Sequence, residues 1–195
     1  SRFLCGRGLS AGAIDAREFL VADGRVGNAS CLPGPTRVRA RSLFDRLFEA
    51  GKLPVVTGFI GQDMEGRTTT LGRGGSDLTA TLLGEALSAD LVEIWTDADG
   101  IMSADPRRVK DAVSIKEITF KEAIELSNFG AKVMYSRALT ASLRSGIPVA
   151  VRNTFNPTAA GTLIKADSEE KSFSVTLKEG TQVITVFNPE MIGTS

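Results

Sequence analysis

The sequence contains no histidine, and this absence removes several kinds of chemistry before any motif is considered. Without histidine there is no Ser-His-Asp or Cys-His nucleophile system, no imidazole acid–base catalyst and no ordinary zinc site. Any reaction must therefore depend on Lys, Arg, carboxylates, hydroxyl groups, backbone N–H donors or a hard cation such as Mg²⁺.

The chain is also poor in cysteine and has no excess of either charge. Two cysteines, Cys5 and Cys31, are too few for a disulfide scaffold, so we expect a reducing, cytoplasmic environment. The 23 Lys and Arg residues balance the 23 Asp and Glu residues, which argues against a nucleic-acid partner. No apolar run approaches the ~20 residues of a membrane-spanning helix, so no membrane partner is expected. The 195 residues suffice for one good-sized domain, or for one domain and part of another.

Hydrophobic patterning predicts strands and helices that alternate along the chain. We expect strands at residues 18–22, 53–61, 91–96, 147–151 and 161–164, and helices at residues 38–50, 76–88, 119–128 and 135–145. Residues 23–36, which are rich in Gly and Pro, are expected to form a loop. The alternation predicts an α/β fold, a three-layer αβα sandwich with a mainly parallel sheet.

The segment from Thr68 to Asp77 is the most informative stretch of the chain. It contains three glycines, which permit positive φ and a close approach of the backbone to a ligand. Arg73 can bind a carboxylate or phosphate through two parallel hydrogen bonds. We expect Ser76 to cap the following helix, whose free N–H groups attract anions. The segment therefore predicts an anion-binding loop, although a flexible surface loop has a similar composition.

Five motifs, in this order and spacing, closely resemble aspartokinase from about Leu53 to Ile164. They are Val56-Thr57-Gly58-Phe59-Ile60-Gly61, Gly66 to Asp77, Glu93-Ile94-Trp95-Thr96-Asp97-Ala98-Asp99-Gly100-Ile101, Ala104-Asp105-Pro106-Arg107 and Phe129-Gly130-Ala131-Lys132-Val133. The resemblance implies the amino-acid-kinase fold and MgATP as phosphoryl donor. It implies phosphorylation of the side-chain carboxylate of L-aspartate to 4-phospho-L-aspartate, which leads toward lysine, threonine and methionine. Direct transfer to a carboxylate needs positioning more than a strong base, so it is compatible with the lack of histidine.

The resemblance also assigns roles to individual residues. The implied substrate-binding residues are Phe59, Arg73, Gly74, Gly75 and Ser76, and the implied nucleotide-binding residues are Thr96, Asp97, Met102, Arg107, Lys132 and Val133. Asp77 and Lys132 are the candidate catalytic residues, with Asp77 either holding the substrate ammonium group or organising the Mg²⁺ shell. No separate metal site is expected. The structural alternatives are that Asp77 stabilises a helix N-terminus, and that Arg107 belongs to a type I turn.

The resemblance divides the chain into three parts. Residues 1–164 are expected to be an amino-acid-kinase domain, residues 165–172 a linker, and residues 173–195 the first part of a regulatory ACT-like region. A complete ACT region would bind an end-product amino acid and mediate contacts of a homodimer. We expect the family's N-terminal Lys-Phe-Gly-Gly-Thr-Ser segment to be missing from this sequence. Arg7 stands where the family has a substrate-binding glutamate. Because of the missing segment and of Arg7, the chain alone is expected to be almost inactive.

Two other functions remain open at this point. The first is a non-catalytic relative or subunit that binds nucleotide or amino acid and acts through assembly. The second is another amino-acid kinase, for example one acting on acetylglutamate, although the motifs at residues 66–77 and 95–97 count against it.

Overall fold

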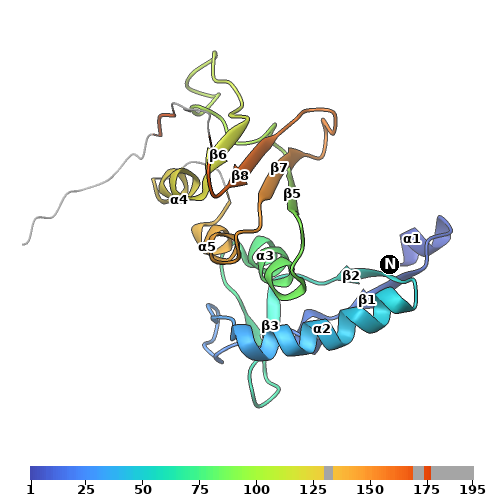
Figure 1. The fold of residues 1–195 in the computed structure, drawn as a ribbon. Coiled ribbons are helices and arrows are strands. Elements are labelled where there is room, and N and C mark those ends of the chain that lie inside the picture. The colour runs from blue at the N-terminus through green and yellow to red at the C-terminus, as the bar shows by residue number, and fades with distance from the viewer. Residues whose placement is uncertain (130–133, 169–173, 177–195) are drawn as a thin grey trace, which may run out of the picture.

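The structure is a computed structural model that describes residues 1–129, 134–168 and 174–176 (Figure 1). Its helices are α1 (Arg2–Gly6), the 3-10 helix η1 (Ala16–Glu18), α2 (Pro33–Glu49), α3 (Gly75–Leu87), α4 (Phe120–Asn128) and α5 (Ser136–Ser145). Its strands are β1 (Ala11–Ile14), β2 (Leu53–Val56), β3 (Ile60–Gln62), β4 (Thr68–Thr70), β5 (Val92–Thr96), β6 (Glu117–Thr119), β7 (Val149–Asn153) and β8 (Thr162–Lys165). The predicted α/β alternation is confirmed.

The strands form three sheets rather than the single, mainly parallel sheet that we predicted. Strands β1 and β2 pair in parallel, β3 and β4 form an antiparallel pair, and the third sheet has the order β5-β7-β8-β6. In this third sheet β5 is parallel to β7, and β6 is parallel to β8, but β7 and β8 are antiparallel. The reason is the short connection over residues 154–161, because a parallel crossover needs about a dozen residues or more.

The helices pack in a layer beside the four-stranded sheet. Figure 1 shows α3, α4 and α5 on one side of this sheet, with α2 beyond α3. Contacts link α5 to both α3 and α4, and α2 to α3. Within the described residues we see no second helical layer over this sheet, so that part of the predicted sandwich is not observed. The largest fully buried side chains include Phe19, Phe44, Leu71, Phe120, Ile118, Leu139 and Ile164.

Three predicted helices are confirmed to within one or two residues. At the start of α4, Thr119 and Glu122 form the predicted reciprocal capping box. Helix α5 ends at Ser145 and is capped by Gly146, which takes a left-handed conformation with φ 71°. Helix α3 begins at Gly75, but its N-cap is Gly74, so the prediction that Ser76 caps this helix is wrong. Ser76 is the second residue of the helix.

Two predicted strands are wrong in detail. Residues 19–22 are buried as expected, but Glu18 is exposed and ends η1. In place of a strand, the segment forms two isolated bridges, Val21 to Gln62 and Ala22 to Cys31. The predicted strand at 53–61 is interrupted after Val56, because Phe59 has φ 77°, which is incompatible with a continuous strand.

The predicted loop at residues 23–36 ends earlier than expected, because α2 begins at Pro33. Proline is tolerated in the first turn of a helix, where its missing N–H would have no partner. Helix α1 and strands β1 and β6 were not predicted. Of the proposed linker at 165–172, Lys165 belongs to β8, and residues 169–172 lie outside the described residues. Most of the predicted ACT-like part (173 and 177–195) also lies outside them. No helix in the described part of the chain is long and apolar enough to cross a bilayer.

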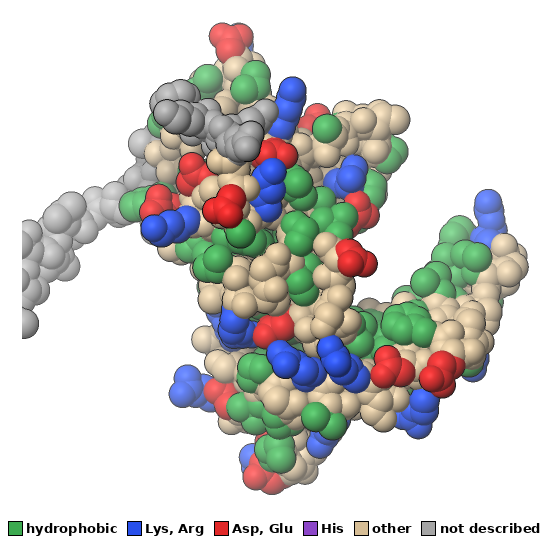
Figure 2. Space-filling model, in the orientation of Figure 1, with side chains coloured by type: hydrophobic (Ala, Val, Ile, Leu, Met, Phe, Trp, Pro, Cys, Tyr) green, Lys and Arg blue, Asp and Glu red, His purple; other side chains and the backbone are tan. Residues whose placement is uncertain are grey.

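Helix α1, strands β1 and β2 and the end of α2 project as an arm from the rest of the molecule (Figure 1). Hydrophobic side chains are exposed on this arm, as Figure 2 shows, and they include Phe3, Leu9, Phe48 and Leu53. The backbone of Leu53 is fixed to the start of the arm, since its N–H donates to Ser10 O over 2.7 Å.

Candidate active site

Helix α3, which follows the predicted substrate loop, packs against β5, which ends at the predicted nucleotide residue Thr96. Helix α3 leads through a short turn into β5, and α5 leads through Gly146 into β7. Because β5 and β7 are parallel, the N-termini of both helices lie near the carboxyl ends of these strands. The carboxyl ends of strands in α/β sheets are the usual place for ligands.

The end of β2 packs directly against the start of α3. A β-carbon on Gly58 would lie 3.1 Å from Cα of Ser76, and one on Gly75 would lie 2.8 Å from Cδ2 of Phe59. The N–H of Phe59 donates to Oγ1 of Thr79 over 3.0 Å, and that hydroxyl donates to Gly75 O over 2.7 Å. The structure therefore brings Phe59, Gly75 and Ser76 together, as the sequence predicted.

The glycine loop is a supported turn rather than a flexible surface loop. Residues 68–70 belong to β4, so the loop proper is shorter than predicted and covers residues 71–74. Gly72 and Gly74 have φ 77° and 68°, a region that favours glycine. A β-carbon on Gly72 would lie 2.8 Å from Oδ1 of Asn28, and one on Gly74 would lie 2.5 Å from Cβ of Tyr135. Both positions therefore require glycine, because a side chain would collide with these atoms and because the positive φ is unfavourable for other residues.

The loop and the first turn of α3 present complementary groups. Arg73 and Ser76 are exposed, and Arg73 makes no hydrogen bond or ion pair with any other described residue. The N–H groups of Ser76 and Asp77 belong to the first helical turn, where no intrahelical acceptor exists. Asp77 is half-buried, and this desolvation raises the pKa of its carboxyl group. A guanidinium, free N–H donors and a carboxylate together suit a ligand with both acidic and cationic groups.

The ends of β5 and β7 form the second part of the candidate site. Thr96 donates from Oγ1 to Oδ1 of Asp97 over 3.2 Å, and Thr96 O accepts from the N–H of Thr154 over 2.8 Å. Oδ1 of Asp99 accepts from Nδ2 of Asn153 over 2.9 Å and from Nδ2 of Asn156 over 3.1 Å. These amide contacts join the loop after β5 to the loop after β7.

Neither asparagine was predicted from the sequence. A usable signal was present for Asn153, because it ends a strand parallel to the one that Thr96 ends. No comparable signal marked Tyr135 or Asn28, since their contacts with the glycine loop connect distant segments.

The structure gives less support to the remaining residues that we predicted to bind nucleotide. Met102 forms an isolated bridge with Ser114. Arg107 donates to its neighbour Asp105 from Nε over 3.0 Å and from Nη2 over 2.7 Å. These hydrogen bonds lower the pKa of Asp105 to about 2. The N–H of Arg108 donates to Asp105 O over 2.9 Å, so this segment forms a turn, as the structural alternative predicted. Lys132 and Val133 lie outside the described residues.

The structure overturns the interpretation of Arg7. Arg7 follows α1 and precedes β1, and β1 runs parallel to β2 with Ile14 opposite Val56. Arg7 is therefore at the amino end of this strand pair, whereas Gly58 and Phe59 follow its carboxyl end. Because four residues of strand span ~13 Å, Arg7 does not face the candidate substrate loop.

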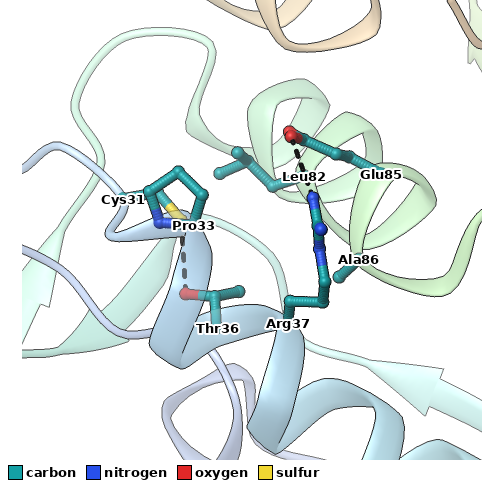
Figure 3. Close-up of a pocket in the computed structure, with 7 residues that line it drawn as sticks. All are labelled: Cys31, Pro33, Thr36, Arg37, Leu82, Glu85 and Ala86. Atoms are coloured by element: carbon teal, nitrogen blue, oxygen red, sulfur yellow. Dashed lines mark hydrogen bonds and ion pairs between the residues drawn. The ribbon is translucent and has the colours of Figure 1, made fainter. Parts of the chain in front are cut away.

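A pocket separate from this site lies between α2 and α3 (Figure 3). It is lined by Cys31, Pro33, Thr36, Arg37, Leu82, Glu85 and Ala86. Glu85 pairs there with Arg37 over 3.8 Å and with Arg144 over 2.5 Å, so its charge is already compensated. The pocket lies beside the C-terminal half of α3, away from the glycine loop at the other end of that helix.

The fold and the candidate site are typical of an amino-acid kinase, and comparisons with known proteins agree with this class. The sequence profile of the amino acid kinase family matches residues 1–153, and the chain belongs to this family. Within the family its similarity is to aspartokinases. It is 41% identical over 189 residues to lysine-sensitive aspartokinase 3 of Escherichia coli (strain K12), covering 95% of this chain and 42% of that protein. It is 38% identical over 192 residues to chloroplastic aspartokinase 1 of Arabidopsis thaliana, covering 95% of this chain and 34% of that protein.

Solved structures give the same result. The crystal structure of E. coli aspartokinase III in complex with aspartate and ADP matches with a TM-score of 0.80 and 46% identity, covering 85% of this chain and 37% of that one. The UMP kinase of Bacillus anthracis has a TM-score of 0.56 at 16% identity, covering 83% of this chain and 60% of that one, which reflects the common fold alone. This chain spans less than half the length of the aspartokinases it matches. The predicted amino-acid-kinase fold is confirmed.

Proposed function

We propose that the protein containing this chain is an aspartate kinase, which transfers the γ-phosphoryl group of ATP to the side-chain carboxylate of L-aspartate. The product is 4-phospho-L-aspartate, which leads toward lysine, threonine and methionine. The observation that carries the proposal is the packing of Phe59 against Gly75, which joins the end of β2 to a glycine loop bearing a free Arg73. The similarity to a solved aspartokinase containing aspartate and ADP supports it.

Aspartate would bind at the turn formed by residues 73–77. Arg73 would bind one carboxylate through two hydrogen bonds, and the N–H groups at the start of α3 would stabilise negative charge nearby. Gly74 and Gly75 would let the backbone approach the ligand, Ser76 would add a hydroxyl group, and Phe59 would form an apolar wall. Asp77, whose carboxylate has no cationic partner among the described residues, would hold the substrate ammonium group or contact the hydrated Mg²⁺.

The nucleotide would lie along the carboxyl ends of β5 and β7. Thr96 and Asp97 would contact it there, with Met102 beside the base and Arg107 near the phosphates. Lys132 and Val133 would complete the site, and Lys132 would neutralise charge on the transferred group. These assignments follow the resemblance of residues 93–107 and 129–133 to aspartokinase.

The chemistry needs no protein base. A carboxylate is ionised at neutral pH, so its oxygen can attack the γ-phosphorus directly, in line with the departing ADP oxygen. The chain's residues would position the two substrates and balance charge on the transferred phosphoryl group. Mg²⁺ would enter with ATP as part of that substrate, and it binds proteins through one or two carboxylates together with phosphate oxygens. The half-buried carboxylate of Asp77 fits this kind of contact.

The finer details of assembly and regulation also belong to this proposal. Residues 173–195 would begin an ACT-like region that binds an end-product amino acid and supports a homodimer. The boundaries would be a kinase domain at 1–164 and a linker at 165–172. Free Cys5 and Cys31 suit a reducing compartment such as the cytoplasm.

Release of ADP by the full-length protein tests the proposal. We expect ADP release that depends on L-aspartate and is much slower with glutamate or N-acetylglutamate. Equal or faster turnover of N-acetylglutamate would identify a different amino-acid kinase. Nucleotide binding with no turnover of any of the three would favour a non-catalytic relative.

A further inference from the structure

Arg137, in the first turn of α5, joins two segments that are far apart in the sequence. Its Nη1 donates to Oδ1 of Asn28 over 2.5 Å and to Leu71 O over 2.9 Å, and its Nη2 donates to Ala29 O over 2.8 Å. The side chain is half-buried, and no described carboxylate pairs with it. The acceptors of its three hydrogen bonds are therefore all uncharged oxygen atoms.

These acceptors lie where the chain enters the glycine loop. Leu71 is fully buried and is followed by Gly72, whose β-carbon position is 2.8 Å from Oδ1 of Asn28 and 3.0 Å from Gly27 O. The N–H of Ala29 donates to Thr70 O over 2.9 Å. Residues 27–29 therefore form a platform beneath Gly72, and Arg137 holds this platform and Leu71 together.

The same end of α5 supports the loop at a second point. Tyr135 lies two residues before Arg137, and its Cβ is 2.5 Å from the β-carbon position of Gly74. Arg73 lies between these two supports, and its side chain makes no hydrogen bond or ion pair with another described residue. The orientation of Arg73 therefore depends on how firmly its two glycine neighbours are held.

We propose that Arg137 is a positioning residue for the substrate loop, which holds residues 71–74 so that Arg73 is presented to the substrate carboxylate. The identity of that substrate rests on the proposed function. Arginine suits this role because its planar fork can donate to several acceptors at once, whereas the ammonium group of lysine is a compact point charge on a flexible stem. The loops after β5 and β7 are joined by other contacts, notably Asn153 to Asp99, and Arg137 makes no hydrogen bond to either of them.

The proposal predicts a selective effect on one substrate. In the full-length protein, Arg137→Ala should raise KM for aspartate by ~10-fold or more, the scale expected when charge-assisted hydrogen bonds are lost. KM for ATP should change by less than ~3-fold. Arg137→Lys should give an intermediate KM for aspartate, and it keeps the charge if the alanine variant folds poorly.

Arg144→Ala is the matched control. Arg144 is on the same helix but pairs with Glu85 at the opposite end of α3 from the glycine loop. Its loss should lower Tm and leave both KM values within ~2-fold of the wild type, because the Glu85 pair does not touch the loop. Equal increases of both KM values in Arg137→Lys, or an unchanged KM for aspartate in both Arg137 variants, would overturn the positioning role.

Hydrogen–deuterium exchange separates this inference from the proposed function, because it needs no turnover. The amides of residues 71–77 should exchange faster in Arg137→Ala and Arg137→Lys than in wild type, and Arg144→Ala should leave them unchanged. Unchanged exchange in both Arg137 variants would refute the inference even if the wild type phosphorylates aspartate. Faster exchange, in a wild type that does not turn over aspartate, would support the loop contact and refute only the assigned substrate.

Discussion

Gly75 and Phe59 are packed so closely that a β-carbon at position 75 would lie 2.8 Å from Cδ2 of Phe59 and 3.3 Å from its Cα. Phe59 is itself held with φ 77°, a conformation that is rare for residues other than glycine. Its N–H is fixed by the buried hydroxyl of Thr79. The strained end of β2 and the start of α3 thus form one rigid unit, on which the candidate substrate site is built.

Gly75→Ala should damage this unit. The new methyl group must displace Phe59 or the backbone beside it, and overpacking of this kind costs ~1–3 kcal/mol. We expect lower stability in urea denaturation, together with a higher KM for aspartate. Gly12→Ala is the control, because no atom beyond the chain neighbours lies within 4 Å of a β-carbon there. A Gly75→Ala variant as stable and active as Gly12→Ala would contradict the packing account.

Asp77→Asn should raise the stability of the protein and lower its activity. Burial raises the pKa of Asp77, so this group favours folding below its unfolded pKa of ~3.9 and loses that contribution as pH rises through the folded pKa. The ionised carboxylate therefore costs stability at pH 7, and the neutral amide should raise Tm there. Below about pH 4 the two proteins should converge, since both then carry a neutral group at this position.

The same substitution should lower kcat by on the order of 10²-fold, because a charged group at the reacting site is lost. Thermal unfolding between pH 3 and 8, with steady-state kinetics at pH 7, measures both effects. A variant with lower Tm and full activity would show that Asp77 serves only the helix N-terminus.

Much of the scaffold around this site could be predicted, because its signals are local. The capping box of Thr119 and Glu122, and Gly146 at the end of α5, are encoded within one turn of helix. The break at Phe59 could not be predicted in this way. Its positive φ is stabilised by Thr79, a residue twenty positions later that is in contact only after folding.

In the candidate site, too, features with a local signal were predicted, and contacts between distant residues were not. Arg73 and the glycines around it were identified from the sequence, since their spacing resembles that of a known family. Ser76 was wrongly predicted as a cap, because Gly74 takes the left-handed conformation that starts the helix one residue earlier. Arg7 was misplaced because β1 was not predicted, and only this strand shows at which end of the β1–β2 pair Arg7 lies. Arg137 reaches Asn28 across more than a hundred residues, so no local pattern marks it.

Arg107→Ala tests whether this arginine serves the nucleotide or only its own turn. If Arg107 contacts phosphates, KM for ATP should rise by ~3–10-fold, the range of one partly exposed charged contact. KM for aspartate should stay constant. Lys110→Ala removes an exposed positive charge three residues later in the same loop, and it should change neither constant. Equal kinetics in the two variants would assign Arg107 to the pair with Asp105 alone.

Asn153→Ala should weaken the nucleotide end of the site. Asn153 is buried, donates to Asp99 and accepts from the N–H of Phe155 over 2.8 Å. Its loss leaves the N–H of Phe155 without this acceptor and leaves Oδ1 of Asp99 with Asn156 as its remaining side-chain donor. We expect a loss of ~1–3 kcal/mol in unfolding free energy and a higher KM for ATP. Asn156→Ala, which removes an exposed donor to Asp99 and an exposed acceptor for the Thr158 hydroxyl, should have a smaller effect in both measurements. Larger changes in unfolding free energy and in KM for ATP in Asn156→Ala than in Asn153→Ala would rule out the bridging role of Asn153.

Trapping of the product by hydroxylamine tests the central claim most directly. An acyl phosphate reacts with hydroxylamine to give a hydroxamate and inorganic phosphate, so the full-length protein with ATP and L-aspartate should form aspartyl hydroxamate. Formation should require ATP and fall by on the order of 10²-fold in Arg73→Ala, since the bidentate carboxylate contact is lost. Absence of hydroxamate from the wild type, or full yield from Arg73→Ala, would contradict an aspartate kinase built on this glycine loop.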